Sequence, residues 1–336
     1  MRIAIDVMGG DVGPEVIIAA ALRCAADYPD LKLDLVGDRQ LIEKEMGDRQ
    51  VDLDRIAVCH APQVVEMGEK PALALRHKRQ SSMHFAIGKV KSAEADACVS
   101  SGNTGALMAI GRYLLKTLAG IDRPAIIKAM PSTSGRCYLL DLGANINCEV
   151  ENLIQFAAMG SLMCGAVENI AKPRVGLLNI GEEEIKGGEQ INVAAGLLRD
   201  NAFLNFIGFV EGDAIYQSGA DVIVCDGWVG NVALKTSEGL AKFVALLIQD
   251  AFEENVATRA AALIANPTLN KLRSKLQPEQ YNGATMLGLQ GVVVKSHGNT
   301  TEGGFYNAIE VAIREAEQDV PNLIARRLDE VLDAYH

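Results

Sequence analysis

The chain has 336 residues, of which 49% are hydrophobic and 22% are charged, a composition typical of a globular protein with a sizeable core. Its formal net charge is −11 at pH 7, so it lacks the overall basic character of many nucleic-acid-binding proteins, and we expect no nucleic-acid partner. Any anionic substrate or partner would have to be held by local groups of positive charge.

Short apolar and β-branched segments alternate with longer amphipathic ones along most of the chain. We predict strands at residues 2–7, 31–37, 55–61, 97–101, 125–130, 137–143, 174–181, 206–212, 221–227 and 291–298. Segments with apolar residues at helical spacing lie between most of them, such as 14–28, 104–118 and 149–170. This alternation predicts a three-layer α/β/α fold with a mostly parallel sheet. No linker-like segment divides the chain, so we expect a single domain over residues 1–336.

The region from about Ser237 to Leu276 departs from this alternation, because its pattern is helical and contains no clear strand. A residue before proline disfavours the helical conformation, so Asn266 and Pro267 predict that one helix ends there and another begins. We expect this helical insertion, at about residues 240–280, to pack on a partner or to cover an edge of the fold.

Loops rich in glycine, asparagine and aspartate follow six of the predicted strands. Their sequences are "MGGDVGPE", "SSGNTGA", "DLGANIN", "NIGEEEIKGGE", "CDGWVGN" and "KSHGNTTEGG". In open parallel sheets, ligands bind at the carboxyl ends of the strands. We therefore expect these loops to lie on the same edge of the sheet and to form a binding site.

The first of these loops allows two interpretations. A helix that begins with proline at its first position explains "GPE", but it does not explain Gly9 and Gly10. These two glycines indicate a close approach of another backbone segment or of a ligand. Asp6, at the end of the preceding strand, would either accept hydrogen bonds from the loop or simply end the strand.

The loop "SSGNTGA" has no bulky side chain and leads into a predicted helix. Free N–H groups at a helix N-terminus form an anion site, which Gly102, Asn103, Thr104 and Gly105 would line. The alternative is a turn capped by the side chain of Asn103 or Thr104. No Gly-Lys-Ser/Thr sequence follows and no G-x-G sequence occurs, which argues against a Walker loop and a dinucleotide-binding fingerprint.

A single lysine, Lys186, lies among the glutamates of "GEEEIKGGE". One interpretation is an ion pair on a solvated surface with Glu182, Glu183 or Glu189. The other is a positive charge for a phosphate group or a developing oxyanion, held in place by those carboxylates. The flanking glycines favour a site.

Four further residues follow predicted strands and allow both structural and functional interpretations. Asn231 either caps the helix that continues from Val232 or contributes an amide to a site, and Asp226 lies in the same loop. Asn145 and His297 end other strands and are weaker candidates. The nearby Trp228, the only tryptophan, would either wall a substrate or pack as a hydrophobic staple.

The sequence predicts no metal site and no disulfide. The seven cysteines include no Cys-x-x-Cys pair, the five histidines include no H-E-x-x-H motif, and Cys225 is interpreted as a buried strand residue. Asp6 interrupts the apolar start too early for a signal peptide, and no apolar run has the length needed to span a bilayer. We therefore expect a cytoplasmic protein with reduced thiols.

Five segments occur in the order and spacing of a known family: "IDVMGGDVGPE", "SSGNTGALMAIGR", "DLGANINC", "NIGEEEIKGGE" and "CDGWVGNVALK". They resemble the bacterial phosphate acyltransferases of phospholipid synthesis, and "VVVKSHGNT" resembles the family's final strand. This resemblance covers nearly the whole chain. It implies transfer of a long acyl chain from acyl carrier protein to inorganic phosphate, which gives acyl phosphate for the acylation of glycerol 3-phosphate. It also implies a fold like those of isocitrate and isopropylmalate dehydrogenases and of phosphotransacetylase, and no cofactor.

The resemblance implies roles for individual residues. Lys186 and Asn231 match catalytic positions: Lys186 would contact phosphate and the thioester oxyanion, and Asn231 would orient or donate to the same centre. The other implied site residues are Asp226 in catalysis, and Asp6, Gly9, Gly10, Gly102, Asn103, Thr104, Gly105, Asn145 and His297 in substrate binding. Two positions depart from the family pattern, since Ser101 replaces an expected alanine and the sequence after Gly298 has no close match.

The resemblance also implies partners. It implies a homodimer with helices of residues 242–276 in the interface, and an apolar tip that touches the membrane near a membrane-bound glycerol-3-phosphate acyltransferase. The tip comprises Ala261, Leu263, Ile264 and Leu269, for which a place in the dimer core is the alternative. Two basic clusters would receive the acidic carrier protein or anionic lipid, unless they are solvated surface: Lys271, Arg273 and Lys275, and Arg76, His77, Lys78 and Arg79.

Three other functions are compared with this one. A phosphotransacetylase-like enzyme would use a short acyl-CoA, and the sequence does not distinguish it. A decarboxylating dehydrogenase of related architecture would need clustered arginines and metal-binding aspartates, which we do not find. A non-catalytic anion-binding module would explain the loops through binding alone.

Overall fold

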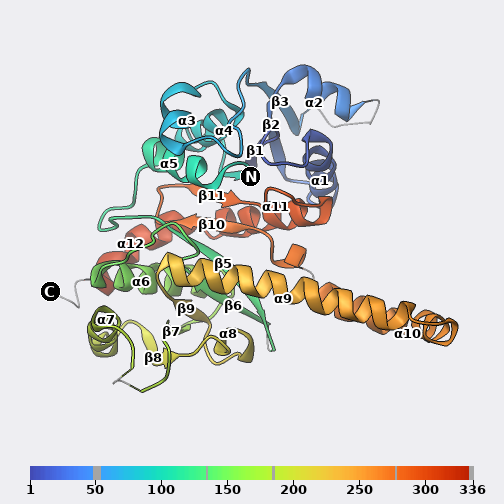
Figure 1. Ribbon diagram of the computed structural model, residues 1–336. Coiled ribbons are helices and arrows are strands. Elements are labelled where there is room, and N and C mark those ends of the chain that lie inside the picture. Colours follow the sequence, from blue (N-terminus) through green and yellow to red (C-terminus); the bar gives the residue numbers. More distant parts are fainter. Residues whose placement is uncertain (48–53, 134, 184–185, 277, 333–336) are drawn as a thin grey trace.

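The computed structural model describes residues 1–47, 54–133, 135–183, 186–276 and 278–332, without the side chains of residues 263, 268, 270–276 and 278. Within these ranges, eleven strands form one sheet in the order β3-β2-β1-β4-β11-β10-β5-β6-β9-β7-β8 (Figure 1). The strands are β1 (Arg2–Asp6), β2 (Lys32–Gly37), β3 (Ile56–His60), β4 (Ala97–Ser100), β5 (Ala125–Ser132), β6 (Gly135–Leu140), β7 (Arg174–Leu178), β8 (Asn205–Val210), β9 (Val222–Val224), β10 (Ala284–Leu287) and β11 (Val292–Lys295).

The sheet consists of two parallel halves that run in opposite directions. Strands β3, β2, β1, β4 and β11 are parallel to one another, and so are β6, β9, β7 and β8. Between the halves, β10 is antiparallel to both β11 and β5, and β5 is antiparallel to β6. The mostly parallel sheet is confirmed, but the expectation of one common edge for all six loops is wrong. A short strand that the sequence did not predict, β10, and the β5–β6 hairpin reverse the direction.

Helices cover both faces of each half-sheet (Figure 1). On the first half, α1 and α11 pack on one face, and α4 and α5 on the other. On the second half, α6, α7 and α12 cover one face, and α8 and the start of α9 the other. The helices are α1 (Pro14–Asp27), α2 (Arg39–Met46), α3 (Pro71–His77), α4 (Ser82–Lys91), α5 (Thr104–Leu115), α6 (Val150–Val167), α7 (Glu189–Asp200), α8 (Ala214–Gln217), α9 (Gly227–Glu253), α10 (Val256–Leu276), the 3-10 helix η1 (Pro278–Tyr281), α11 (Glu302–Glu317) and α12 (Val320–Leu332).

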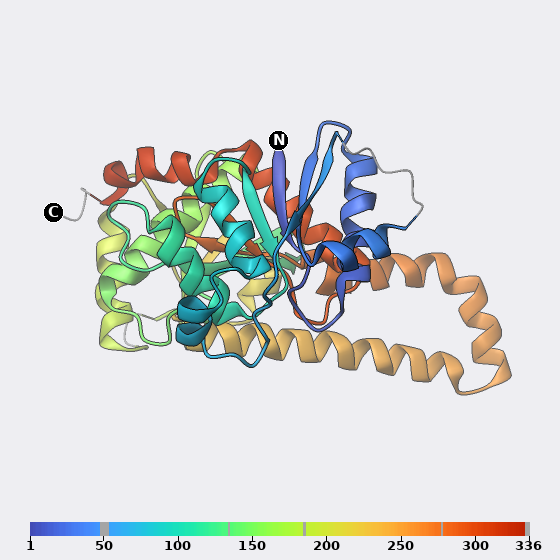
Figure 2. The ribbon, with the colours of Figure 1, turned by 90° about the horizontal axis from the view of Figure 1, so that it is seen from above.

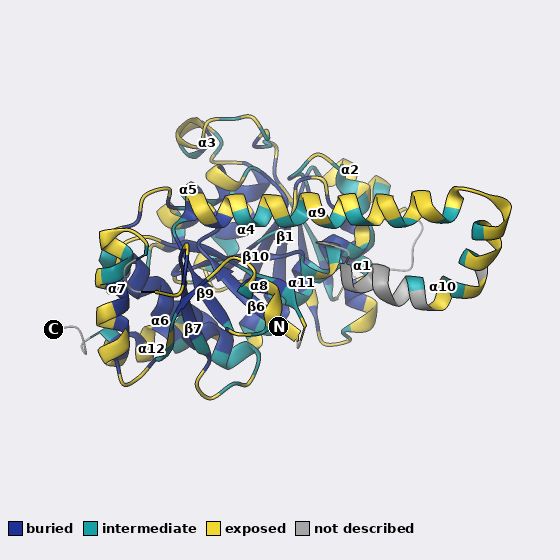
Figure 3. Ribbon diagram, turned by 60° about the horizontal axis from the view of Figure 1, so that its bottom comes forward, coloured by how far each residue is buried: buried dark blue, intermediate teal, exposed yellow. Residues whose placement is uncertain are grey.

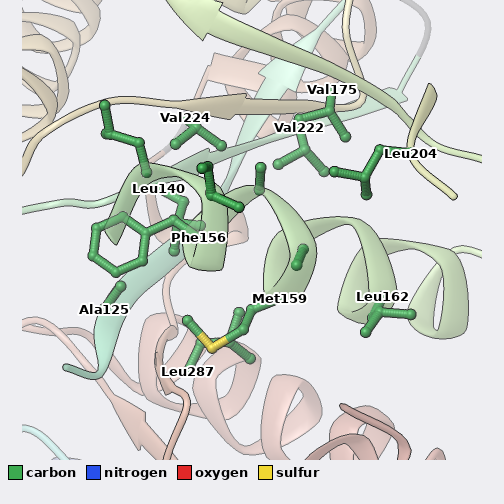
Figure 4. Close-up of a cluster of buried hydrophobic side chains, with 14 of the residues drawn as sticks. Ala125, Leu140, Phe156, Met159, Leu162, Val175, Leu204, Val222, Val224 and Leu287 are labelled. Carbon is green, nitrogen blue, oxygen red and sulfur yellow. The ribbon is translucent and has the colours of Figure 1, made fainter. Parts of the chain in front are cut away.

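The largest core cluster surrounds α6. Its Phe156 and Met159 are fully buried, and they pack among side chains of β5, β6, β7 and β9 such as Leu140 and Val222 (Figure 4). By length and composition, α6 alone among the described helices could cross a membrane, so the expectation that no apolar run is long enough is wrong. However, 72% of this 18-residue stretch is buried inside the protein, which is typical of a core helix.

Helices α9 and α10 form an antiparallel hairpin that projects beyond the body of the molecule (Figure 2). Most of its outer part is exposed (Figure 3). The predicted helical region is confirmed, but the predicted break at Asn266–Pro267 is wrong, because Pro267 lies inside α10. The break falls at Asn255, whose backbone N–H donates to Thr258 Oγ1 and whose Oδ1 accepts from the Thr258 N–H, both at 3.0 Å. This reciprocal cap starts α10.

Candidate active site

The carboxyl ends of the two half-sheets meet in the middle of the sheet. Ser100 and Lys295, the last residues of β4 and β11, lie in one row of paired residues that crosses β10 to Lys128 of β5. Leu140, the last residue of β6, pairs with Ile127 in the adjacent row. Loops from both halves therefore emerge at neighbouring levels, although their strands run in opposite directions.

A cleft of about 530 Å³ lies at this junction. It receives residues from the loops after β1, β3, β6 and β11 and from the segment before β10, and it also contacts β5, β10, the start of α5 and the first turns of α9. Of the site residues predicted from the sequence, Thr104, Asn231 and His297 line it. Among the described residues, its charged lining consists of Asp11, Lys128, Lys235, Glu238, Lys295 and His297.

Lys295 is a largely buried cation of the cleft. Its Nζ donates to the backbone oxygen of Ser101 at 3.1 Å and to that of Ser296. Burial lowers the pKa of Lys295 to about 8, with a smaller lowering from Lys235, while Asp6 and Asp11 oppose the shift. Lys295 therefore carries its charge at neutral pH, and among the described residues its Nζ donates only to these two neutral acceptors.

Glu238 joins two further lysines of the cleft. Its carboxylate lies 3.6 Å from Lys128 Nζ and 2.9 Å from Lys235 Nζ. Burial lowers the pKa of Lys128, whose side chain is only 11% exposed, and Glu238 partly opposes this shift. Burial alone would raise the pKa of Glu238, but the two lysines more than offset it and leave it lowered. The group is thus a charged cluster with net positive charge.

His297 adds a neutral donor to this cluster. Burial, with smaller contributions from Lys235 and Lys295, lowers the pKa of His297. Its Nδ1 accepts a hydrogen bond from the Asn299 N–H at 3.1 Å, so the neutral ring carries its proton on Nε2. That N–H is available to an acceptor in the cleft.

The glycines of the first loop allow the backbone after β1 to pack closely against the backbone after β4. A Cβ at Gly9 would lie 2.7 Å from the backbone nitrogen of Gly102, and one at Gly10 would lie 2.7 Å from Ser101 Oγ. Ser101 Oγ donates to the Gly9 carbonyl at 2.7 Å. Asp6 is fully buried below this contact and accepts from Ser100 Oγ at 2.6 Å. Burial raises the pKa of Asp6, and its Oδ1 has no partner in the described structure.

The loop before α5 is a capped turn that packs closely against neighbouring side chains. Asn103 caps the helix by accepting from the Ala106 N–H at 2.9 Å, and its Nδ2 donates to the carbonyls of Met67 and Glu69. A Cβ at Gly102 or Gly105 would meet Met83 or Pro71 within 2.7 Å. These residues thus shape the loop, while Thr104 and the N-terminus of α5 border the cleft.

The start of α9 presents Asn231 to the cleft. Asp226, not Asn231, caps this helix, since its Oδ1 accepts from the Val229 N–H at 2.8 Å. The interpretation of Asn231 as the cap is therefore wrong, and its amide lies one turn inside the helix, in the cleft lining. Trp228 is 62% exposed and forms an apolar part of the same wall.

Two predicted residues engage other protein groups. Asn145 is buried, and its Nδ2 donates to Asp141 at 3.0 Å and to the Pro124 carbonyl at 2.9 Å. Lys186 Nζ lies 2.8 Å from Glu183 Oε2, and this contact raises the pKa of Lys186. Neither lines the cleft, although the loop of Lys186 neighbours that of Asn145, since Gln190 donates to Glu149 at 3.2 Å.

The lysines of the cleft were not among the residues predicted from the sequence. Lys295 lies in "VVVKS" and Lys128 in "AIIKA", where a lysine ends or interrupts a buried apolar strand. That rare placement was the available signal, because a buried lysine needs a partner or a function. Lys235 and Glu238 lie on an amphipathic helix and carried no such signal.

The arrangement is suited to an anion. Three lysines, a neutral histidine donor and the N-termini of α5 and α9 converge on one cleft. Burial strengthens their attraction for negative charge. Among the described residues no group of three histidine, cysteine, aspartate or glutamate side chains could hold a metal ion. Cys225 is buried with its pKa well above the usual range, which makes it a poor nucleophile.

Comparisons with known proteins match nearly the whole chain. A family model described as "Fatty acid synthesis protein" matches residues 1–323. The chain is 53% identical over 333 residues to a phosphate acyltransferase of Methylococcus capsulatus, covering 99% of this chain and 98% of that protein. It is 51% identical over 330 residues to the phosphate acyltransferase of Nitrosococcus oceani, covering 98% and 97%.

Solved structures with a similar fold are more distant in sequence. A phosphotransacetylase from Streptococcus pyogenes matches with a TM-score of 0.63 at 16% identity, over 95% of this chain and 94% of that one. A 4-hydroxythreonine-4-phosphate dehydrogenase from Klebsiella pneumoniae matches with a TM-score of 0.54 at 14% identity, over 94% and 98%. These likenesses bear out the predicted fold class.

Proposed function

This chain belongs to the phosphate acyltransferase family, which makes it an acyltransferase with phosphate as acceptor, and we propose that its donor is a long-chain acyl carrier protein. The observation that carries the proposal is the cleft with Lys128, Lys235, Lys295 and His297 at the junction of the half-sheets. It offers positive charge and N–H donors for phosphate beside room for a second substrate. The acyl phosphate product would serve the acylation of glycerol 3-phosphate in phospholipid synthesis.

The proposed reaction needs no nucleophile from the protein. A phosphate oxygen attacks the thioester carbonyl carbon, the new C–O bond forms, and the C–S bond breaks. The sulfur leaves with the bonding electron pair and takes up the proton that phosphate loses. The cleft lysines and His297 hold the anion against the carbonyl carbon, so catalysis consists of positioning and of offsetting charge repulsion.

Individual residues have different parts in the proposal. Asn231 donates its amide to the thioester oxyanion, and Thr104 contacts phosphate. Lys186 supports the same oxyanion, which requires its ion pair with Glu183 to open. Asp226 acts through its cap on α9. The remaining predicted residues act by shaping the loops: Asp6, Gly9, Gly10, Gly102, Asn103, Gly105 and Asn145.

The segment of α3 supports docking of an acidic carrier protein. Arg76, His77 and Arg79 are exposed, and the nearby Met67 lines the cleft. Opposite charges would steer the carrier towards the cleft mouth. The second predicted cluster, Lys271, Arg273 and Lys275, lies outside the described side chains.

The hairpin of α9 and α10 supports the proposed homodimer and membrane contact of a cytoplasmic enzyme. Val256 and Ile264, at its far end, are 83% and 85% exposed. Ala261 is exposed and Leu269 partly buried, whereas the Leu263 side chain is not described. Such apolar exposure is typical of an interaction surface, and here we propose that it lies in the dimer or beside the membrane-bound enzyme that uses the product.

A short-chain acyl-CoA donor is the second candidate, because phosphotransacetylases are among the structural neighbours. Purified protein is mixed with phosphate and either palmitoyl carrier protein or acetyl-CoA, and both the released thiol and the acyl phosphate are measured. We expect phosphate-dependent turnover with the carrier thioester and at least about tenfold lower kcat/KM with acetyl-CoA. The reverse preference would establish the second candidate.

Two lysine variants connect this activity to the cleft. Lys295→Met removes a largely buried cation of the cleft, and Lys32→Met removes an exposed lysine at the start of β2 as a matched control. We expect the first variant to lose at least about a hundredfold in kcat/KM for phosphate, as for loss of an electrostatic contact in a transition state, and the control to keep it. Equal activity of both variants would contradict a role for the cleft.

A further inference from the structure

A second cavity, of about 440 Å³, lies beside the cleft. We call it the α9 groove; its walls come from β5, α8, α9 and η1, and Figure 1 shows α9 crossing the β5–β6 hairpin. The lining residues of α9 fall on one face at helical spacing, with Leu234, Ser237, Ala241 and Val244 among them. This face is largely apolar, and it has no covering element in the described chain.

The groove and the cleft share a wall. Lys128, Leu234 and Glu238 line both cavities. The Lys128–Glu238 ion pair therefore marks the boundary between a charged compartment and an apolar one. A molecule that lies across this boundary would have an anionic or polar reacting end and a hydrocarbon tail.

We propose that the α9 groove holds the hydrocarbon chain of the acyl donor, with the carbonyl group at the wall that the two cavities share and the phosphate in the cleft. This inference rests on the proposed acyl transfer and adds the binding site of the chain to it. The groove's charged side chains lie at the shared wall, while Met130, Pro131, Leu240, Ala241 and Val244 line the rest together with tyrosine, serine and threonine side chains. Its size falls within the range of ligand pockets.

The groove gives a physical reason for selection of long chains. Each methylene group transferred from water to an apolar wall contributes up to about a fourfold gain in affinity. The gain continues until the chain reaches the open end of the groove. We therefore expect kcat/KM to rise with acyl length over a series from acetyl to palmitoyl thioesters, while KM for phosphate stays constant.

The test is a substitution that fills the groove. Ala241→Trp places a large ring on the lining face of α9, and Ala251→Trp places the same ring at an exposed position ten residues along the helix and outside the groove. We expect Ala241→Trp to lower kcat/KM for palmitoyl thioester at least about tenfold while it leaves the rate with short thioesters unchanged, since the cleft is intact. The control keeps the wild-type ratio of long- to short-chain rates.

Turnover of short thioesters also reports that the variant folds. Should Ala241→Trp lose all activity, Val244→Asn provides a smaller change of the same wall, with the same expected fall in the long- to short-chain ratio. An unchanged ratio in a folded variant would overturn the groove as the chain site but leave acyl transfer standing. A changed oligomeric state with an unchanged ratio would assign the groove to a second copy of the chain instead. Absence of phosphate-dependent turnover with every donor would remove the proposed function itself.

Discussion

Lys295 illustrates how one side chain connects folding and proposed function. It ends a strand whose other residues are buried and apolar. Within the part of the chain that the structure describes, its Nζ donates only to two backbone carbonyls, and the side chain lines the open cleft. Burial of a charged lysine at this position costs desolvation energy, and the pKa of Lys295 is lowered for the same reason. An anion bound in the cleft would offset that desolvation energy. Lys295 is therefore better suited to binding an anion than to stabilising the fold.

The first prediction concerns pH. Since the pKa of Lys295 is about 8, its charge is present below that value and lost above it. We expect KM for phosphate to rise about tenfold between pH 7 and pH 9, as the protonated fraction falls. In Lys295→Arg the guanidinium stays charged, so this rise should be absent from steady-state KM measurements. The same rise in the arginine variant would assign it to another group.

The second prediction concerns Asp6, whose negative charge raises the pKa of Lys295. Asp6→Asn keeps the size of the side chain and an acceptor for Ser100 Oγ, which lies 2.6 Å from Asp6 Oδ2. We expect the pH at which KM for phosphate begins to rise to move to a lower value. A pH profile identical to that of the wild type would mean that Asp6 acts only on the packing of the loops.

At this scale the sequence predicted some residues and missed others for physical reasons. Thr104, Asn231 and His297 followed strands, and they line the cleft. The role of the loop glycines could not be predicted from the sequence. A glycine that makes room for a ligand and one that makes room for a neighbouring backbone segment look the same in a sequence. Lys295 and Lys128 were missed because the burial of a lysine depends on tertiary contacts.

At the scale of elements, the cleft depends on how α9 begins against the loop after β6. Gly230 lies so close to Asp141 that a Cβ would stand 1.9 Å from the Asp141 carbonyl oxygen. That contact sets the start of α9, and thereby the place of Asn231, Lys235 and Glu238 along the cleft. A glycine is needed there for space, since its φ lies outside the positive range.

The third prediction follows from this contact. Gly230→Ala should lower the free energy of unfolding by at least about 2 kcal/mol, because backbone must move to admit the methyl group. Gly239→Ala is the matched control in the same helix, where an added Cβ meets nothing within 4 Å. It should raise the free energy of unfolding by about 0.5–1 kcal/mol. Denaturant titrations of both variants check this, and equal effects would contradict it.

The sequence predicted most elements but not the reversal of the sheet. Long apolar strands such as β1 and β2 and the helices between them have strong periodic signals. By contrast, β10 has four residues, and its antiparallel pairing depends on the distant β5 and β11. The hydrophobic pattern of a strand does not show in which direction it runs relative to distant strands. The two half-sheets therefore could not be distinguished from one continuous parallel sheet.

At the scale of the whole molecule, the α9–α10 hairpin is exposed along much of its described length (Figure 3). Phe243, Leu246 and Leu247 are each more than half exposed along α9, outside the lining of the groove. A helix with this much exposed apolar surface is typical of one that packs on another chain. The proposed homodimer accounts for it, and it leaves Ala241 and Val244 to the α9 groove.

The fourth prediction tests that assembly. Phe243→Glu combined with Leu246→Glu places two charges on the exposed face, away from the lining of both cavities. We expect the molar mass in sedimentation equilibrium to fall to that of one chain, because buried like charges oppose association. Arg39→Glu, an exposed change on α2, is the control. A monomeric wild type, or a variant that stays dimeric, would contradict the proposed interface.

A titration of inorganic phosphate at pH 7, followed by calorimetry, shows whether the cleft binds phosphate. We propose that phosphate binds in the cleft between the half-sheets, at Lys295. We expect Lys295→Met to weaken binding at least about tenfold, as for loss of a charged hydrogen bond, while Lys186→Ala and Lys32→Met bind like the wild type. Wild-type affinity in Lys295→Met together with lost binding in Lys186→Ala would contradict the claim and move the phosphate site to the loop after β7.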